Sequence, residues 1–552
     1  MAKDLIFEIG CEEVPASFLP RALNLLDSAL RKHLSDARLG FKDIRALGTP
    51  RRLALIAEGV QERQEDVVRE LKGPQKQAAF GPEGKPTKAL EGFMRSQGIS
   101  QKDIKIIQTE KGEYVLATKK IQGEDALKVL PDVLVKTIST ELFPKSMRWG
   151  AHDITFARPI HWLLALYGGK PIGFSYGHVK SSSTTRGHRF MKDKKSALFK
   201  PTSVSSYLSG LKERKVMLDP EERKRVIEKG LAAAAKEVSG RVLQNNGLVE
   251  EVAFLVEWPI VFRGAFDREF LSLPNHVVIN AMREHQRYFS VVDEKGALLP
   301  YFLTVANTDA KDINVVRKGN ERVLMARLND AKFYFEKDIK TPLKDMAQRL
   351  KGVVFQSKLG TSFEKVERFT RLAVFMGSEL KYCDNFNALE KVEDFFADAP
   401  ERYPKGSTQY NKRIMARASL LCKADLTSGM VLEFPKLQGI MGSVYAERGG
   451  EAPEVAQAIY EHYLPIASGS ALPASLPGAI ISIADKLDTI TGCFSVGLIP
   501  TGAQDPYALR RQALGIIEIM LDKGFSVPLD TLVDMAINSL EKKLLRDRAK
   551  VK

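Results

Sequence analysis

The chain has 552 residues, of which 44% are hydrophobic and 27% are charged. This is ordinary globular composition, so it excludes a mostly disordered or collagen-like chain, and the length predicts about three or four domains. The formal net charge is +15. Residues 180–229 hold 14 basic against 6 acidic residues, and residues 541–552 hold 6 against 2. Such clusters favour a polyanionic partner, although a solvated basic face explains charge alone equally well.

The sequence predicts a cytoplasmic protein with no membrane partner. No apolar run reaches the roughly eighteen residues of a membrane span, and the start, MAKDLIFEIGCEEVP, lacks the apolar stretch of a signal peptide. The closest two of the four cysteines lie 39 positions apart, and the eight histidines form no HExxH motif. We therefore expect neither a disulfide framework nor a metal site.

The first part of the chain alternates strand-like and helix-like patterns. Apolar residues recur at helical spacing behind Pro20, and Gly168-Gly169 is a turn pair that tolerates positive φ. Asp219 can cap a helix, with Pro220 at its first position and Glu222 completing a capping box. The expected elements are strands at 4–10 and 52–60, a helix at 22–34, a surface loop at 65–90, hairpins turning at 110–113 and 168–169, and a helix at 124–141.

From about residue 340 onward helical patterns dominate, so we predict a domain boundary near 335–345. The fold class is multidomain α/β plus all-α. The predicted domains are 1–340, an α/β region of one or two subdomains; 341–530, a helical domain; and 531–552, a basic helical tail. The expected helices in the second part are 362–380, 388–398, 411–433, 452–464, 476–492 and 506–522.

Signatures of common catalytic sites are missing from the sequence. It contains no GxxxxGK[ST] loop, no GxGxxG after a strand and no GxSxG elbow, and GPEGKP at 81–86 has the wrong spacing for a phosphate loop. No nucleophile with an adjacent base stands out. We therefore predict no catalytic residue on this chain.

Four clusters of basic residues stand out, and three of them also hold aromatic residues or glycine, which suits RNA because arginine clamps phosphates and rings stack on unpaired bases. The alternative is a set of structural ion pairs and cation–π contacts within the fold. The clusters are TPRRLAL with Arg51 and Arg52, KSMRWG with Lys145, Arg148 and Trp149, STTRGHRF with Arg186, His188, Arg189 and Phe190, and REHQRYF with Arg283, His285, Arg287, Tyr288 and Phe289.

The run DPYALRRQALGI at 505–516 predicts an amphipathic helix that Asp505 caps and Pro506 opens. Arg510 and Arg511 fall off its apolar stripe and are further candidates for RNA contact. As a whole string, this run resembles the signature of the beta subunit of bacterial heterotetrameric glycyl-tRNA synthetase. Further blocks resemble that family in order along residues 4–525, among them LIFEIGCEEVPASFLPRAL, TPRRLAL, RPIHWL, RGHRF, EEVAFLVEWP, GNERVLMARLNDAKFYFEKD and IADKLDTI.

The resemblance implies a division of labour between two kinds of chain. In this family two alpha and two beta chains form the enzyme, a glycine–tRNA ligase. The alpha chain binds ATP, Mg²⁺ and glycine and forms the adenylate, whereas the beta chain binds tRNA(Gly), holds no cofactor itself and is needed for charging. The resemblance also implies that the N-terminal α/β region is similar to the tRNA-binding and editing-like domain of phenylalanyl-tRNA synthetase beta chains.

The family's middle region resembles an HD-type helical domain, whose metal site needs a His-Asp doublet and further His and Asp ligands. Here Ala424 stands where the doublet histidine is required, so only Asp425 remains, and Asp485 resembles the last aspartate. Two carboxylates without imidazoles make a poor transition-metal site. We therefore expect a degenerate HD site with no metal, whose residues pair within helices.

Two other functions remain open from the sequence: an HD-type metal-dependent phosphohydrolase, which Ala424 argues against, and a general RNA-binding protein. Members of the resembled family continue into a helical anticodon-binding domain, and we expect this chain to lack it, through truncation or as a short natural form. Any editing activity, and the face that meets the alpha chain, are not determined by the sequence.

Overall fold

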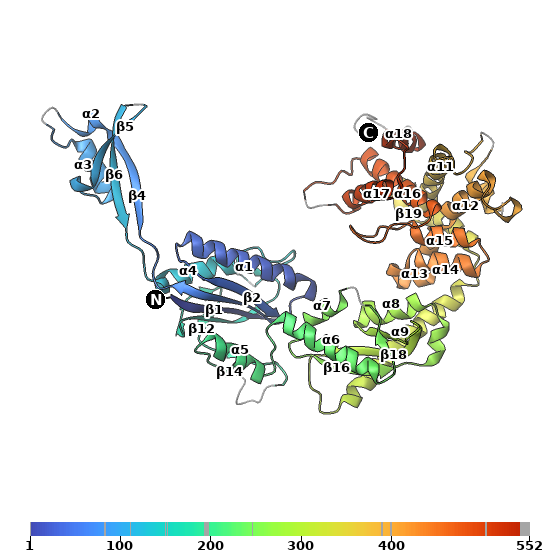
Figure 1. The fold of residues 1–552 in the computed structure, drawn as a ribbon, viewed down its shortest axis with the longest axis horizontal. Helices are drawn as coiled ribbons and strands as arrows, with labels where there is room; N and C mark the ends of the chain where they lie inside the picture. Colours follow the sequence, from blue (N-terminus) through green and yellow to red (C-terminus); the bar gives the residue numbers. More distant parts are fainter. Residues whose placement is uncertain are drawn as a thin grey trace. The chain divides into compact units, whose positions relative to one another are not determined.

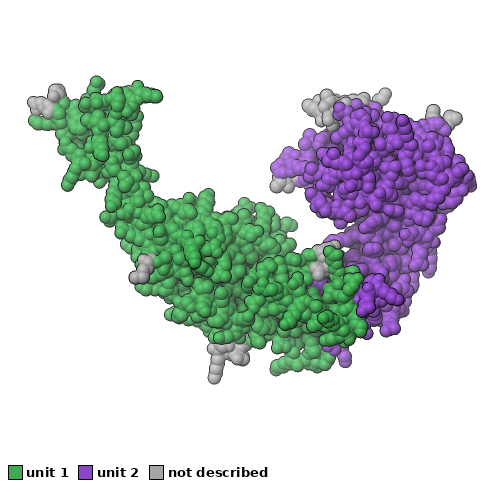
Figure 2. Space-filling view, in the orientation of Figure 1, with its two compact units in different colours: residues 1–263, 303–316 green, residues 264–302, 317–552 purple. Residues whose placement is uncertain are grey.

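The chain divides into two compact units, shown in different colours in Figure 2: residues 1–263 with 303–316, and residues 264–302 with 317–552. The predicted boundary near 335–345 lies inside the second unit, at the point where helical sequence patterns begin to dominate. Among the described residues, no helix has both the length and the apolar character needed to cross a membrane. The computed structural model describes residues 2–81, 84–110, 112–149, 151, 153–191, 198–244, 247–387, 390–397, 400–502 and 505–540.

A mixed sheet, mostly antiparallel, forms the centre of the first unit (Figure 1). Its strand order is β11-β12-β9-β1-β3-β2, and β10 also pairs with β9. The predicted strands at 4–10 and 52–60 are confirmed as two neighbouring inner strands, β1 and β3. The bounds are β1 Ala2–Cys11, β2 Asp43–Thr49, β3 Arg52–Gln61, β9 Ile160–Tyr167, β10 Lys170–Pro171, β11 Ser175–Tyr176 and β12 Val179–Ser182.

Helices cover both faces of this sheet because side chains alternate between the faces of β1. Leu5, Phe7 and Ile9 pack on one face with α1 (Leu19–Asp36) and α4 (Ala126–Ile138), which confirms the helices predicted at 22–34 and 124–141. Ile6 packs on the other face with Tyr207 and Leu211 of α5 (Val204–Glu213). The polar Glu8 follows Ile6 on this second face, where it needs buried partners.

A separate three-stranded sheet, β4-β6-β5, packs with two short helices around a small core of Ala79, Leu90 and Val115. The hairpin predicted at 110–113 is confirmed, with Thr109 opposite Gly112. The surface loop predicted at 65–90 is wrong, because that segment supplies a strand that pairs with β6, about fifty residues later in the chain. The bounds are β4 Val67–Gln75, α2 Lys76–Ala79, α3 Lys88–Gln97, β5 Ile104–Thr109 and β6 Gly112–Ile121.

Local signals place several other elements of the first unit. Gly168 and Gly169 have φ of 54° and 78° in the predicted turn after β9. The Asp219 carboxylate accepts a hydrogen bond from Glu221 N at 2.8 Å and so caps α6, whereas Glu222 pairs with Lys212. The remaining elements are β7 Met147–Arg148, β8 Thr155–Phe156, β13 Thr185–Arg186, β14 Leu198–Phe199, α6 Pro220–Lys236, β15 Arg241–Val242 and α7 Leu248–Ala253. The positions at which the chain passes from one unit to the other fall inside three elements, β16 Ile260–Ala265, β18 Leu298–Ala306 and α9 Ile313–Asp338.

The second unit is mainly helical, and α16 (Leu476–Ser495) lies at its centre. It packs against α11 (Ser362–Glu379), α15 (Pro453–Glu461) and α17 (Leu509–Lys523), so nearly all of its side chains are buried. The mixed α/β plus helical fold class is therefore confirmed. The other elements are α8 Asn275–Gln286, β17 Phe289–Val292, α10 Leu343–Arg349, β19 Val354–Gln356, β20 Gly360–Thr361, α12 Thr408–Leu421, α13 Gly429–Glu433, α14 Ile440–Arg448 and α18 Leu529–Ser539.

Three predicted helices differ from the structure. The helix predicted at 411–433 breaks at residues 424–427, where a 3₁₀ turn intervenes, and the segment predicted at 388–398 forms only a 3₁₀ turn at Val392–Phe396 among its described residues. Helix α17 begins at Leu509 rather than Pro506, because Ala508 has a φ of 53° and interrupts the helical path. Of the predicted basic tail, residues 541–552 lie outside the described residues.

Candidate functional site

Two arginines and a histidine surround Glu12, directly after the end of β1. Arg51 approaches its carboxylate at 3.7 Å, His161 at 3.2 Å and Arg189 at 3.1 Å. Partial burial alone would raise the pKa of Glu12, but the charges of Arg189, Arg51 and His161 outweigh it and hold that pKa below its ordinary value. The carboxylate therefore holds two arginines, whose two positive charges exceed its own single negative charge.

Exposed basic side chains of the first unit include four predicted RNA contacts: Lys145, Arg148, Arg186 and Arg189. Arg186 lies over the Trp162 ring at 5.3 Å, and Arg189 lies over the exposed Phe190 ring at 5.6 Å. Because Trp162 adjoins His161 in β9, the Arg186 and Arg189 side chains gather at the same end of the sheet. An exposed guanidinium beside an aromatic ring can bind a phosphate and a base together.

Arg52 is fully buried, so the prediction that it contacts tRNA is wrong for this structure. Its guanidinium donates to Glu257 at 3.0 Å and to the Arg186 carbonyl at 2.8 Å, and it lies 3.7 Å from Glu8. Thr185, Tyr207 and Trp162 all donate to the Glu8 carboxylate, and Thr49 donates to Glu257. A buried charge needs such partners, and here the structural alternative holds.

His188 is also buried and acts inside the fold. Its Nδ1 accepts hydrogen bonds from Phe190 N and Met191 N, both at 3.2 Å, so the proton lies on Nε2, which donates to Asn307 Oδ1 at 3.3 Å. Burial lowers the pKa of His188, which keeps the ring neutral. The ring orients the turn that presents Arg189 and Phe190, and its predicted contact with tRNA is wrong for this structure.

The REHQRYF cluster does not form an aromatic surface. Tyr288 and Phe289 are buried, and the Tyr288 hydroxyl donates to Asn320 Oδ1 at 2.6 Å. Arg287 adopts a φ of 57° where α8 ends. These rings are therefore unavailable to stack on RNA bases.

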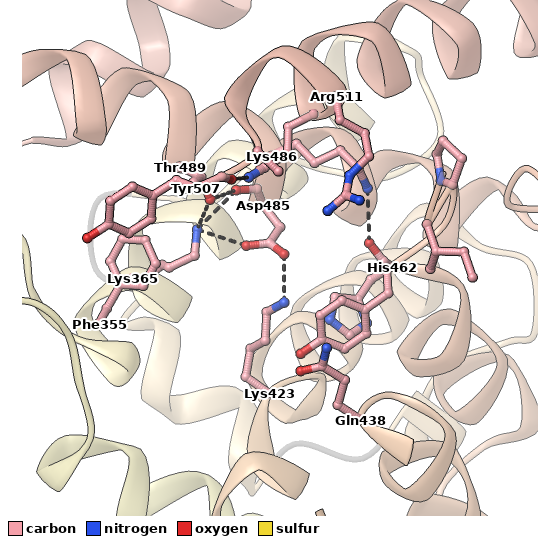
Figure 3. Close-up of a pocket in the computed structure, with 15 residues that line it drawn as sticks. Phe355, Lys365, Lys423, Gln438, His462, Asp485, Lys486, Thr489, Tyr507 and Arg511 are labelled. Atoms are coloured by element: carbon pink, nitrogen blue, oxygen red, sulfur yellow. Dashed lines mark hydrogen bonds and ion pairs between the residues drawn. The ribbon is translucent and has the colours of Figure 1, made fainter. Parts of the chain in front are cut away.

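A cavity of about 450 Å³ in the second unit lies beside Asp485 (Figure 3). Asp485 of α16 pairs with Lys365 at 2.8 Å and with Lys423 at 2.7 Å. Burial by itself would raise the pKa of Asp485, but the two ammonium groups outweigh it and hold that pKa well below its ordinary value. The carboxylate thus stays charged and pairs with two ammonium groups.

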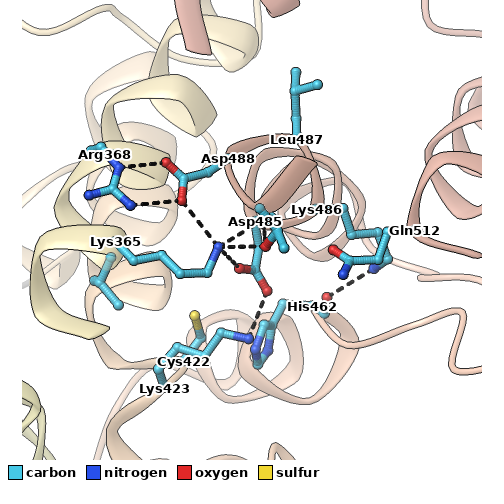
Figure 4. A network of polar contacts seen from close by, with 12 residues as sticks. Lys365, Arg368, Cys422, Lys423, His462, Asp485, Lys486, Leu487, Asp488 and Gln512 are labelled. Atoms are coloured by element: carbon cyan, nitrogen blue, oxygen red, sulfur yellow. Dashed lines mark hydrogen bonds and ion pairs between the residues drawn. The ribbon is translucent and has the colours of Figure 1, made fainter. Parts of the chain in front are cut away.

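Asp425, next to Ala424, forms hydrogen bonds with backbone groups instead of joining the ion pairs of Asp485. Its Oδ2 accepts hydrogen bonds from Gly439 N at 2.6 Å and Gly442 N at 2.9 Å, and burial raises its pKa to about 6. Figure 4 shows the network around Asp485, in which Asp488 also pairs with Lys365 and Arg368. Among the described residues, no group of three His, Cys, Asp or Glu side chains is placed to hold a metal.

Sequence reasoning missed the buried lysines of this cavity, Lys365, Lys423 and Lys486. A lysine inside an apolar helical run, as in IISIADKLDTI and SLLCKADL, was the available signal. Of the two arginines predicted on α17, Arg511 lines the cavity, whereas Arg510 donates to the Gly502 carbonyl at 2.6 Å. The different roles of Arg510 and Arg511 follow from tertiary packing and not from the local sequence.

The described fold and surface define a class: a multidomain protein with a basic α/β unit, a helical unit and no recognisable catalytic cluster. The family model described as "Glycyl-tRNA synthetase beta subunit" matches residues 5–551. The chain is 48% identical over 551 residues to the "Glycine--tRNA ligase beta subunit" of Geobacter sp. (strain M21), covering all of this chain and 76% of that protein. The protein of the same name from Syntrophus aciditrophicus (strain SB) is 48% identical over 546 residues, covering 99% and 75%. The chain therefore belongs to the glycyl-tRNA synthetase beta subunit family.

Proposed function

We propose that this chain is the tRNA-binding, non-adenylating beta subunit of a glycine–tRNA ligase, required with an alpha subunit to charge tRNA(Gly) with glycine. The observation that supports this most is the match of the family along nearly the whole chain, at 48% identity to its relatives. The partner is the alpha subunit, in a complex of two alpha and two beta chains in the cytoplasm. The alpha subunit supplies the ATP, Mg²⁺ and glycine sites of the adenylation step.

The contact with tRNA is proposed for the first unit, through Arg51, Lys145, Arg148, Arg186 and Arg189. Support comes from the exposure of Lys145, Arg148, Arg186 and Arg189, with Arg51 partly buried, and from the exposed Phe190 ring beside Arg189. We infer that this unit is similar to the tRNA-binding and editing-like domain of phenylalanyl-tRNA synthetase beta chains, and that it holds the acceptor half of tRNA.

The helical unit is proposed to be an HD-like scaffold that has lost its metal chemistry. Ala424 removes the doublet histidine, and Asp485 is bound by two lysines, which oppose a metal cation. The chain is therefore proposed to bind no metal of its own, and nothing favours a phosphohydrolase.

Activity assays test the division of labour directly. The purified chain should show no glycine-dependent ATP–pyrophosphate exchange and no charging of tRNA(Gly), and addition of an alpha subunit of the same family should restore both. The alpha subunit alone serves as the control for exchange. Robust glycine-dependent exchange by this chain without alpha would refute the proposal.

A further inference from the structure

The cavity of the second unit has more positive than negative charge in its wall. Four cations line it, Lys365, Lys423, Lys486 and Arg511, against the single carboxylate of Asp485 (Figure 3). Asp485 is already shared by Lys365 and Lys423. Two positive charges of the wall are therefore left without a carboxylate partner among the described residues.

Lys486 is the first of these. It is 7% exposed, and its ammonium donates to the Leu464 carbonyl at 2.8 Å, to Ser482 Oγ at 2.5 Å and to the His462 carbonyl at 3.4 Å. All three acceptors are neutral. A buried ammonium without a counter-charge is unfavourable, and burial lowers the pKa of Lys486 to about 8. An anion in the cavity would supply the missing charge.

Arg511 is the second. Its guanidinium is exposed in the first turn of α17, and it has no hydrogen bond or ion pair with a described residue. Arginine presents a planar fork of donors that matches phosphate oxygens, so it suits an oxyanion better than a halide or a metal. Lys486 and Arg511 thus approach the cavity from two helices, α16 and α17.

His462 adds an unsatisfied acceptor to these donors. Its Nδ1 lies 2.5 Å from the Ile459 carbonyl, which can only accept, so the proton is on Nδ1 and Nε2 presents a lone pair. Nε2 is buried and has no hydrogen-bond partner among the described residues. Burial, followed by the charge of Lys423, holds the pKa of His462 well below its ordinary value. The ring therefore stays neutral, and its Nε2 needs a donor such as a hydroxyl.

We propose that this cavity binds a ribonucleotide, with its phosphate between Lys486 and Arg511 and a hydroxyl donating to His462. The volume of about 450 Å³ is within the range of small-ligand sites. Tyr507, half-buried in the wall on the side of Lys365 and Phe355, offers a ring for the base (Figure 3). A free nucleotide and the terminal nucleotide of an RNA share this chemistry. Such a site is separate from adenylation, for which this chain has no motif.

The test is isothermal titration calorimetry of the full 552-residue chain with AMP, adenosine and inorganic phosphate. AMP should bind more tightly than either fragment. Arg511→Gln should weaken AMP binding about tenfold, the loss expected for one charge-assisted hydrogen bond. Arg510→Gln is the matched control, because Arg510 has the same charge one position away and bonds a loop carbonyl instead; it should bind AMP as the wild type does.

Equal binding of AMP and adenosine, no binding of AMP, or equal losses in the two arginine variants would overturn the proposal. Competition separates the two sources of the ligand. If a short single-stranded RNA ending in CCA displaces AMP, and Arg511→Gln weakens both, the occupant is an RNA end. If the RNA fails to displace AMP from a site that depends on Arg511, the occupant is a free nucleotide.

Discussion

The two units both bury charged side chains, but they satisfy them differently. In the first unit Arg52 lies between Glu8 and Glu257, and hydroxyl and indole donors also bond these carboxylates. In the second unit the cations around Asp485 exceed the carboxylates and border a cavity. A buried cation that pairs with buried carboxylates fixes a fold, whereas an excess of one charge beside a cavity leaves room for a ligand of the opposite charge.

Removal of Arg52 should produce the largest effect. Arg52→Met would leave Glu8 and Glu257 buried without their cation, so we expect a loss of about 3–5 kcal/mol in the free energy of unfolding. Urea unfolding, with hydrogen exchange at β1 and β3 to assign the transition to the first unit, measures it. Arg186→Met is the control. Arg186 is exposed, and its guanidinium lies over the Trp162 ring, so the variant should lose less than about 1 kcal/mol.

Equal stability of Arg52→Met and the wild type would mean that the buried network is not what holds this part of the sheet. The comparison of the two units would then fail for the first unit, because its buried ion pairs would not be what stabilises it.

A pH series should test the excess of positive charge around the cavity of the second unit. The folded pKa of Lys486 is about 8 and its ordinary value is 10.5, so the unfolded chain binds more protons between these values. The contribution of Lys486 to stability therefore rises as pH increases from 8 to 10.5, whereas binding of AMP should fall over the same interval because the ammonium loses its charge. The charged and titratable groups that share the cavity wall with it are Lys365, Lys423, His462, Asp485 and, on α17, Arg511.

Calorimetric titrations of AMP at pH 7 and pH 9 measure this dependence. Lys486→Met should bind AMP more weakly than the wild type at pH 7, and its affinity should differ little between pH 7 and pH 9. An unchanged pH dependence in Lys486→Met would assign the titration to another group and remove Lys486 from the site.

The smallest effects are expected at the exposed arginines. Arg186→Ala and Arg189→Ala should each weaken tRNA binding modestly and lower the slope of log K against log salt by about one unit, without a change in unfolding. Filter binding across a salt series measures both quantities, with Arg225→Ala, an exposed arginine of α6, as the control. We also expect residues 1–552 alone to discriminate poorly between tRNA(Gly) and an anticodon-swapped tRNA.

Loss of thermal stability in Arg186→Ala with unchanged tRNA affinity and salt slope would favour the structural alternative for that residue. Strong discrimination against the anticodon-swapped tRNA would mean that the described units read the anticodon.

Local chemistry explains which elements the sequence predicted. The apolar spacing from Ala22 to Leu34, the Asp219 cap and the Gly168-Gly169 turn depend on residues a few positions apart, and each was confirmed. The strand β4 was missed because its partner, β6, lies about fifty residues away and its own side chains are mostly polar. The tRNA contacts on exposed arginines stay a prediction.

The sequence by itself determined the mixed fold class, the family and the absence of common catalytic motifs. Tertiary structure alone decided what each charged residue does. Arg51 and Arg52 are adjacent in TPRRLAL, yet Arg52 pairs with Glu257, 205 positions away, and is buried. Arg510 and Arg511 are adjacent too, and only Arg511 reaches the cavity. Local sequence fixes helices and strands because their hydrogen bonds are short-range, whereas the partner of a charge is set by segments that meet only when the chain folds.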